Sequence, residues 1–551
     1  MRALPDQPMP LRTSRSALAV SLALTCGSML AVQPLLAAPR PAGAAKVRHA
    51  KALSFGPTTG CERLPGYDPL WSSHDDDFGF LQVGTKPPPG QAEKGEEDDP
   101  IFLSGFYQMQ THGNTLYAAF GGASTRGITP GALVALNART LAFQKIIPLP
   151  FASHAMVLDR EGKRAVVTHT RVNAFSLVDL ATGQSTCRKP DTAIRGDAYQ
   201  GRYVQMDEQG FFYINYNSFS ARVPKGYVMK YTPRGDHAAG FAVRATERAD
   251  LVIPLLYRQG ALLTGTHAVR SVNSQTGAVS RLSPVFGSTN FYNYASGPGN
   301  QLIASNYYSA AARPNLAQVD LATGARNDLF TGSGTVEVAY GAAGGQVFST
   351  NYDSHTLTVA ALPEKGTLSP ERFVNIRFQD SPSNLHVRQT AQGTDIYVTT
   401  KVWGPDNAKR GALLHKVHLD AAVKGIEGIR KPGACSIITF NMVDRAVSPP
   451  VACDLLDPKG TLKAEYRLLR DVSLPELEKN RREGLVLQKQ ARSDLRAALA
   501  RARKHPGKAS SRAVAEARSQ LANASAWIIE LRHQIPEART SLKVLRRMAE
   551  E

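Results

Sequence analysis

A strand-length sequence recurs seven times along this chain, and this repeat constrains the fold more than any other feature. The seven copies are LYAAF (116–120), AVVTH (165–169), FYINY (212–216), LLTGT (262–266), LIASN (302–306), VFSTN (347–351) and IYVTT (396–400), at intervals of 40–50 residues. A closing turn follows each copy, such as Asp-Leu-Ala-Thr-Gly at 179–183 and at 320–324. Apolar strands with Gly-bearing turns at this spacing are typical of four-stranded propeller blades.

Seven such units predict an all-β seven-bladed β-propeller across residues 101–453. Length alone would suggest three or four domains of ~150 residues each in a chain of 551 residues. Because a propeller closes into one ring, its residues need not be divided among several domains. A β-solenoid is the alternative architecture, but its shorter coils fit the observed spacing less well.

Two copies of the repeat and the turns that follow them resemble a known family. GKRAVVTH (162–169) and TDIYVTT (394–400), each followed by a turn of the Asp-Leu-Ala-Thr-Gly kind, are similar to the YVTN-type repeats of bacterial exported propellers, including the YncE-like group. The resemblance covers about residues 101–430 and implies a seven-bladed ring. Blade four is compressed, and blade seven carries the insertion WGPDNAKRGA (403–412). The ligands of such propellers vary, so the resemblance implies an architecture and no particular activity.

The N-terminal 44 residues have the pattern of a signal peptide. Arg12 and Arg15 precede an uncharged run at 16–39, and Ala42-Gly43-Ala44 has the small residues that signal peptidases accept. Export to the periplasm or secretion is therefore expected, with no transmembrane segment after cleavage. An uncleaved membrane anchor is the alternative, since the run is long enough to span a bilayer. Residues 45–100 are read as an N-terminal extension that ends in a Pro-, Gly- and charge-rich linker.

Cysteine usage fits an exported protein. Beyond the signal peptide there are four cysteines, Cys61, Cys187, Cys435 and Cys453, and an even number in an exported chain suggests disulfides. Three connectivities are possible, and pairing Cys435 with Cys453 would close the shortest loop. The cysteines lack zinc-ligand spacing, and neither a metal site nor a cofactor is expected.

The C-terminal region, residues 454–551, changes to helical periodicity and predicts a helical hairpin or coiled coil. Ser473 is the expected N-cap of the first long helix, and a separate short helix is expected to begin at Pro536. Residues 461–551 contain 20 Lys or Arg and 11 Asp or Glu, which gives +9 of the formal charge of +19. This charge indicates either contact with an anionic partner, such as an anionic polymer or nucleic acid, or a solvated helix face.

Aligning the blades on their second strands places one set of polar residues at the start of the innermost strands. His154, Arg202, Tyr292, Glu337 and His386 occupy matching positions. The innermost strands of a propeller surround its central channel, so we expect these side chains to meet at the channel mouth. An error of one residue in the alignment would exchange members of the set.

A second set comes from the repeated Asn-Tyr-x-Ser at the end of the second strand in blades three, five and six. Asn suits the following turn, so a structural role is the expectation for Asn215, Asn306 and Asn351. A turn does not require the aromatic residues that follow them. Tyr216, Tyr307 and Tyr352 are therefore expected either to pack between blades or to form a ligand-stacking surface.

These features favour an exported propeller that binds a ligand or partner protein on its channel face. The basic helical tail would supply a second contact or an oligomerisation element. The alternative is a propeller-type lactonase, lyase or hydrolase that uses His154, Glu337 and His386. The sequence carries no nucleophile motif and no carboxylate cluster, and for this reason we treat binding as the first hypothesis.

Overall fold

The computed structural model describes residues 103–550, except for 124–130, 170–173, 190–198, 219–224, 245–253, 285–290, 308–314, 342–344, 363–369 and 402–411 and for Ala422, Lys424, Val443 and Pro506. The predicted signal peptide and the N-terminal extension therefore lie outside the described residues.

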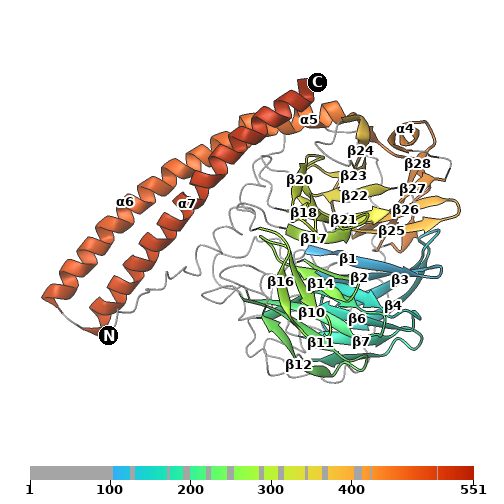
Figure 1. The fold of residues 1–551 in the computed structure, drawn as a ribbon, viewed down its shortest axis with the longest axis horizontal. Coiled ribbons are helices and arrows are strands. Elements are labelled where there is room, and N and C mark those ends of the chain that lie inside the picture. The colour runs from blue at the N-terminus through green and yellow to red at the C-terminus, as the bar shows by residue number, and fades with distance from the viewer. Residues whose placement is uncertain are drawn as a thin grey trace.

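The described strands form seven antiparallel sheets, and each sheet is built on four strands that are consecutive in the chain (Figure 1). Every innermost strand contacts the next one, and β25 contacts β1, so the seven sheets close into a ring. The seven repeated sequences are the second strands β2, β6, β10, β14, β18, β22 and β26, which confirms the predicted seven-bladed propeller.

The strand bounds of the first four blades are as follows. They are β1 (Leu103–His112), β2 (Thr115–Ala123), β3 (Gly131–Asn137) and β4 (Phe143–Leu149) in blade 1; β5 (Ser153–Leu158), β6 (Arg164–His169), β7 (Phe175–Asp179) and β8 (Ser185–Arg188) in blade 2; β9 (Tyr199–Met206), β10 (Phe212–Ser218), β11 (Lys225–Tyr231) and β12 (His237–Arg244) in blade 3; and β13 (Leu255–Arg258), β14 (Ala261–Thr264), β15 (Arg270–Asn273) and β16 (Val279–Arg281) in blade 4.

Of the remaining three blades, blades 6 and 7 carry short additions. Their strands are β17 (Phe291–Ser296), β18 (Gln301–Asn306), β19 (Leu316–Asp320) and β20 (Arg326–Leu329) in blade 5; β21 (Thr335–Gly341), β22 (Gln346–Asn351), β23 (Thr356–Ala361) and β24 (Phe373–Arg377) in blade 6; and β25 (Ser381–Thr390), β26 (Gly393–Lys401), β27 (Leu413–Asp420) and β28 (Cys435–Asn441) in blade 7. The 3-10 turn η2 (Pro370–Arg372) precedes β24, and the helix α4 (Gly425–Ile429) lies between β27 and β28.

The closing turns of the repeat are held by their own side chains. In blade 5 the carboxylate of Asp320 accepts hydrogen bonds from the N–H groups of Ala322 at 2.8 Å and Thr323 at 2.9 Å. Gly324 completes the turn at a φ of +70°, in the left-handed region that glycine tolerates best. The same side-chain capping occurs at Asn137, Asp179 and Asn273. Asp-Leu-Ala-Thr-Gly is thus a turn-forming sequence.

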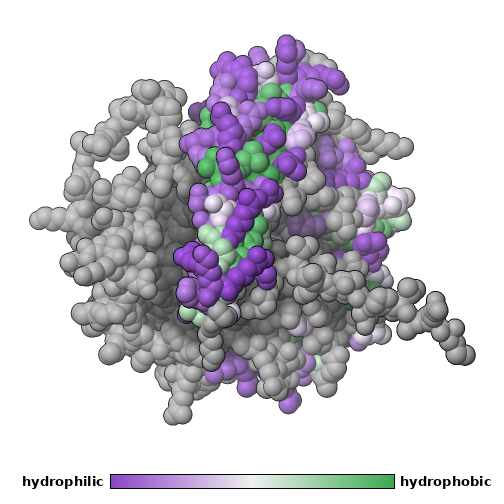
Figure 2. All heavy atoms as spheres, turned by 90° about the vertical axis from the view of Figure 1, so that its left-hand side faces the viewer, coloured by the Kyte–Doolittle hydropathy of each residue, from purple (hydrophilic) through white to green (hydrophobic). Residues whose placement is uncertain are grey.

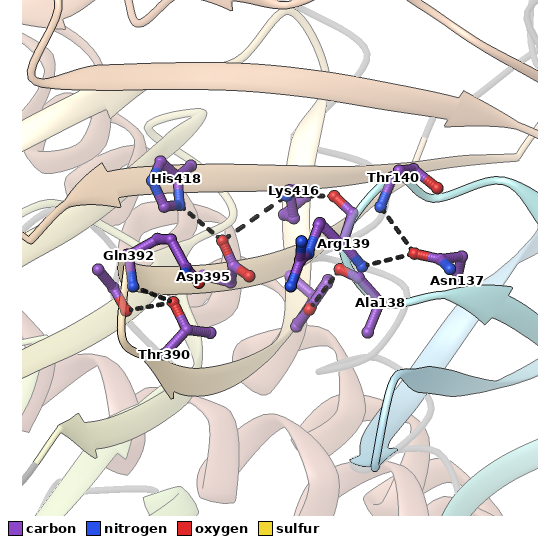
Figure 3. Close-up of polar contacts among 11 residues, drawn as sticks. Asn137, Ala138, Arg139, Thr140, Thr390, Gln392, Asp395, Lys416 and His418 are labelled. Atoms are coloured by element: carbon purple, nitrogen blue, oxygen red, sulfur yellow. Dashed lines mark hydrogen bonds and ion pairs between the residues drawn. The ribbon is translucent and has the colours of Figure 1, made fainter.

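Among the described residues, the ring closes between blades 7 and 1 without any exchange of strands. The buried rings of Phe106 and Phe440 lie 6.2 Å apart at this junction. Polar contacts reinforce it, because the Tyr397 hydroxyl donates to the carbonyl of Ala138 at 2.7 Å and the Lys416 ammonium donates to the carbonyl of Arg139 (Figure 3). Side chains from the second and third strands of blade 7 therefore hold the closing turn of blade 1 by hydrogen bonds.

After blade 7 the chain crosses to the outer edge of blade 6. The short strands β29 (Ala446–Val447) and β30 (Val451–Ala452) pair with β28, and β31 (Leu455–Leu456) pairs with β24. The predicted disulfide between Cys435 and Cys453 is present and ties this crossing segment to β28. The disulfide thus lies directly before the helical region.

The helical region packs against blades 5 and 6. It contains α5 (Pro458–Leu468), the π-helical segment η3 (Leu469–Ser473), α6 (Leu474–Lys504) and α7 (Lys508–Glu550). Leu462 of α5 and Leu545 of α7 are buried in one cluster with Leu329 and Phe373 of the propeller. The expected break at Pro536 is wrong, because α7 continues through this residue. Among the described helices, none combines the length and apolar composition needed to span a membrane.

The two long helices form an antiparallel hairpin that projects from the ring (Figure 1). Buried residues of the two helices recur every seven positions. They include Gly484, Ala491 and Ala498 on α6, and Ala517, Ala524, Leu531 and Ala538 on α7, together with Ile528 and Ile535. Small residues at most of these positions let the two backbones approach closely, so the helical hairpin predicted from the sequence is confirmed.

Removal of the Cys435–Cys453 disulfide is expected to loosen the helical region. Replacing both cysteines by Ser should lower the free energy of unfolding by about 3 kcal/mol, because the unfolded chain regains the entropy of a closed loop; the two cysteines are 18 residues apart. Limited proteolysis should then cut faster near residue 453. The control Val451→Ser, at a position that is 56% exposed, should change neither measurement. Equal cleavage rates in the double variant and the wild type would contradict this role.

Candidate functional site at the channel mouth

The innermost strands begin with an irregularity that repeats around the ring. In β1, β5, β9, β17, β21 and β25 the register with the second strand shifts near the start of the strand. Such a β-bulge leaves backbone groups without ladder partners and redirects the neighbouring side chains. The bulges therefore determine which residues line the mouth of the channel.

Side-chain hydroxyl groups of the second strands form hydrogen bonds with backbone groups at these bulges and so link neighbouring blades. The Thr350 hydroxyl accepts the N–H of Glu337 at 3.2 Å and donates to the carbonyl of Ser383 in the next blade at 2.7 Å. The Thr168 hydroxyl likewise contacts the N–H of Ala155 at 3.1 Å and the carbonyl of Arg202 at 2.8 Å. The recurrent Thr or Ser of the repeat is thus a structural residue that holds the mouth together.

The residues whose N–H groups donate to a side chain of the second strand occupy equivalent positions in five blades; the acceptor is a Thr or Ser hydroxyl in four of them and the Oδ1 atom of Asn215 in blade 3. They are Ala155, Tyr203, Asn293, Glu337 and Asn384. Each is preceded by a bulge residue, and these residues are His154, Arg202, Tyr292, Val336 and Ser383. We call the two sets together the mouth residues.

Aromatic rings form a continuous row across the mouth. The centroid distances are 5.6 Å between Tyr107 and His154, 5.9 Å between His154 and Tyr203, 6.5 Å between Tyr203 and Tyr292, and 5.0 Å between Tyr292 and Tyr307. The row crosses blades 1, 2, 3 and 5. His154, Tyr292 and Tyr307 are only partly buried, so this part of the row borders solvent.

Charged groups lie beside the aromatic row. The Arg202 guanidinium carbon is 5.7 Å from the ring centroid of Tyr292, a favourable cation–π distance. Glu337 is 4% exposed, and its carboxylate accepts hydrogen bonds from the N–H of Leu385 at 2.6 Å and from the Gln108 amide at 3.4 Å. The contacts from Arg202 to Tyr292 and from Gln108 to Glu337 join non-adjacent blades, so these side chains face one another across the channel.

The environment of Tyr203 shows that these groups interact. Burial, followed by neighbouring Tyr292 and Glu337, raises the pKa of the Tyr203 hydroxyl. This hydroxyl therefore stays protonated at neutral pH and remains a hydrogen-bond donor. Tyr203 and Gln108 are not among the residues predicted from the sequence. Tyr203 directly follows the predicted Arg202, so an alignment shifted by one residue would have found it.

His386 lies apart from the mouth residues. Its Nε2 atom is 3.0 Å from the hydroxyl and 3.2 Å from the N–H of Thr111, and its ring stacks on Tyr397 at 6.0 Å. Burial and the charge of Arg388 lower the pKa of His386 to about 4. The predicted trio of His154, Glu337 and His386 is therefore not assembled, because His386 packs between blades 7 and 1.

The tyrosines of the Asn-Tyr-x-Ser repeats separate into two groups. Tyr307 joins the aromatic row. Tyr216 is fully buried, with its hydroxyl 3.0 Å from that of Tyr231, and Tyr352 is 4% exposed. Neither of these two rings offers an open face for stacking, which corrects their assignment as ligand-binding residues.

The asparagines of the same repeats are structural. Asn215, Asn306 and Asn351 are all at most 1% exposed. Asn351 accepts hydrogen bonds from Thr335 and Asn315 and donates to Thr356 and Thr358. The prediction of a structural role is therefore confirmed most directly for Asn351.

A second polar cluster lies at the junction of blades 7 and 1. The buried carboxylate of Asp395 is 2.7 Å from Nδ1 of His418 and 3.7 Å from the ammonium of Lys416 (Figure 3). Burial lowers the pKa of Lys416, and Asp395 opposes this shift. Because Lys416 also holds the closing turn of blade 1, we assign the cluster to ring closure.

Potential metal ligands are few in the described part of the chain. No group of three or more His, Cys, Asp or Glu residues there is arranged to hold a metal ion. The mouth does place the Glu337 carboxylate and the side-chain amides of Asn293 and Asn384 at equivalent positions of three successive blades. Carboxylate and amide oxygens are ligands that Ca²⁺ prefers.

Comparisons with known proteins assign no family to this chain. No protein-family model and no curated protein matches this chain. Similar solved structures include a calcium-binding regucalcin from Agrobacterium tumefaciens, which is 12% identical over 46% of this chain and 83% of its own, with a TM-score of 0.32. A putative 6-phosphogluconolactonase from Bacteroides uniformis is 12% identical over 65% of this chain and 100% of its own, with a TM-score of 0.41.

A third similar structure is Hsv2 from Kluyveromyces lactis, 9% identical over 63% of this chain and 99% of its own, with a TM-score of 0.37. Identities and TM-scores this low carry no argument about the activity of this chain. The resemblance to YVTN-type repeats is likewise supported only as far as the seven-bladed ring. The chain is a seven-bladed β-propeller that carries a C-terminal helical hairpin.

Proposed function

We propose that this protein binds a ligand at the channel mouth of its propeller. The observation that carries the proposal is the row of aromatic rings from Tyr107 to Tyr307, whose solvent-bordering members lie beside Arg202. Tyrosine rings offer large stacking faces at low entropic cost, and arginine pairs well with carboxylate or phosphate groups. The site therefore suits a ring-containing ligand, such as a sugar, that carries an anionic group.

We also propose that the protein acts outside the cytoplasm. The predicted signal peptide at 1–44 supports this location. The Cys435–Cys453 disulfide is consistent with it, because disulfides persist in oxidising compartments.

Replacing Tyr292 by Ala is expected to weaken ligand binding at least tenfold. Tyr292 contacts Tyr203 edge-to-face and Tyr307 at a tilt, and its loss would separate Tyr307 from the rest of the row. An array that pairs neutral oligosaccharides with their uronic-acid and phosphorylated counterparts would identify a ligand, and calorimetry would then compare the variants. Arg202→Ala should lose the preference for the anionic members.

Tyr257→Ala is the matched control for this experiment. Tyr257 is a partly buried tyrosine of blade 4 whose hydroxyl contacts Glu208 at 2.6 Å, away from the aromatic row. Its substitution should leave ligand affinity unchanged. Equal affinities of Tyr292→Ala and the wild type would contradict binding at the mouth.

A second candidate function is cation-assisted hydrolysis of a lactone or ester. It is favoured by the oxygen donors of Asn293, Glu337 and Asn384 at equivalent mouth positions. These side chains would hold a hard cation such as Ca²⁺, which polarises a carbonyl oxygen. His154 lies on the same row as a base for a water molecule.

Two measurements test the hydrolase candidate. Calcium should raise the melting temperature of the wild type, and Glu337→Gln should abolish both this shift and any turnover on a panel of lactones and esters. A wild-type protein with no turnover and no response to calcium or a chelator would eliminate this candidate and leave ligand binding as the function.

A further inference from the structure

Three adjacent apolar side chains on α6 are exposed to solvent. Leu485 is 42% exposed, Val486 68% and Leu487 54%. They account for three of the six exposed large apolar residues in the described part of the chain. Apolar residues exposed one at a time are ordinary on a protein surface, whereas a contiguous group indicates an interaction site.

The position of Gly484 explains why the three side chains form a belt around the helix. Gly484 is buried in the hairpin. Successive residues of an α-helix are separated by about 100°, so the next three residues occupy the rest of the circumference. Leu485, Val486 and Leu487 thus form an apolar belt across the outward surface of α6.

Basic residues continue this outward surface in both directions. Arg482 and Lys489 lie about one helical turn before and after Val486, and both are exposed. Lys479, Arg496 and Lys504 are also exposed along α6. From residue 474 to 504 the helix has nine Lys or Arg and four Asp or Glu, a formal charge of +5. We call this surface, from Lys479 to Lys504 with the apolar belt, the α6 face.

A partner of the α6 face has to match both its positive charge and its apolar belt. A second copy of the chain would bring an identical, positively charged hairpin against it, and the two would repel. Nucleic acid would neutralise the bases but would leave the apolar belt without a partner. A bilayer with anionic headgroups satisfies both features, because the bases meet phosphates while the apolar side chains enter the boundary between headgroups and acyl chains.

We propose that the α6 face docks the protein on an anionic lipid surface, with Leu485, Val486 and Leu487 inserted and Arg482, Lys489 and Arg496 at the headgroups. Figure 2 looks at the side of the molecule on which the hairpin stands and shows apolar patches on it bordered by hydrophilic residues. Figure 1 shows α7 between α6 and the propeller, so the outward surface of α6 faces away from the ring.

Vesicle flotation of the full-length protein, purified after export, tests this proposal. The wild type should bind vesicles of phosphatidylcholine with 30% phosphatidylglycerol and not vesicles of phosphatidylcholine alone. Replacing Leu485, Val486 and Leu487 together by Ser should weaken binding at least tenfold, since the insertion of these side chains is lost. Arg482→Gln with Lys489→Gln should weaken it as well, and 0.5 M salt should reduce binding by the wild type.

The control is Val279→Ser, which changes an exposed valine of the propeller and should bind vesicles as the wild type does. Circular dichroism should show unchanged helix content in the triple Ser variant, because the three side chains are exposed. The proposal is overturned by wild-type protein that binds neither vesicle, or by a triple variant that binds as well as the wild type. It is also overturned by dimerisation that the triple variant abolishes, or by binding to a DNA duplex in the absence of vesicle binding.

Discussion

Acidification from pH 7 to pH 4 is expected to destabilise the propeller strongly, because two buried histidines are held neutral in the folded state. His169 is fully buried with its Nε2 atom 2.8 Å from the Ser176 hydroxyl, and burial lowers its pKa to about 3. His415 lies between the hydroxyls of Thr400 and Thr439 at 3.0 and 2.9 Å, and burial lowers its pKa to about 4. Protonation of either ring would place a charge in the core.

The direction of the effect follows from proton binding. Below pH 6.5, the ordinary pKa of histidine, the ring binds a proton in the unfolded chain. In the folded protein it does so only when the pH approaches the lower pKa of the buried ring. Stability is therefore complete above about pH 6.5 and falls as the pH decreases. Full protonation of His415 alone would lower the free energy of unfolding by roughly 3 kcal/mol relative to its value at pH 7. Full protonation of His169 would lower it somewhat more.

Urea unfolding midpoints measured from pH 4 to pH 8 would check this prediction. His415→Gln should show a smaller decrease between pH 7 and pH 4 than the wild type does, although its stability at pH 7 is expected to be lower. His505→Gln, which changes an exposed histidine near the tip of the hairpin, should retain the full decrease. Parallel decreases in the wild type, His415→Gln and His169→Gln would show that the buried rings do not cause the acid sensitivity.

Replacing Phe440 by Ala is expected to open the ring at the junction of blades 7 and 1. Phe440 is fully buried there with Phe106, Leu414 and other apolar residues of both blades. Loss of a buried phenylalanine costs about 3–5 kcal/mol because a cavity replaces its contacts. The described strands of the first and last blades belong to separate sheets, so side-chain contacts such as that of Phe440 with Phe106 join them at this position.

Hydrogen exchange distinguishes ring opening from general destabilisation. In Phe440→Ala, amides of β1 and of blade 7 should lose protection before those of other blades. Phe212→Ala is the matched control, since Phe212 is equally buried in a cluster formed by blades 2, 3 and 4. It should cost a similar free energy without the local loss at the junction. Uniform loss of protection in Phe440→Ala would contradict a special role for this contact.

The blade repeat could be predicted because its determinants lie within a few residues of one another. Asp320 binds N–H groups two and three positions ahead, and Gly324 adopts the left-handed conformation that ends the turn. VFSTN at 347–351 likewise reads as a strand, and all of its residues are buried between neighbouring blades. Local hydrogen bonding and periodicity therefore identify seven blades without knowledge of the tertiary structure.

The mouth residues could be predicted only in part, since the distance from the bulge to the second strand differs between blades. Tyr203 lies nine residues before Phe212, whereas Asn384 lies twelve residues before Ile396. An alignment at constant spacing consequently finds His154, Arg202 and Glu337. It also substitutes His386 for Asn384 and misses Tyr203.

The sequence by itself determined the repeated strand, the turn chemistry and the helical hairpin, because each depends on residues close together in the chain. The tertiary structure alone decided which side chains meet across the channel and how the ring closes. Gln108 and Glu337 are separated by 229 positions, yet they form a hydrogen bond at the mouth. Such contacts depend on the angle between whole blades, and no local pattern in the chain encodes that angle.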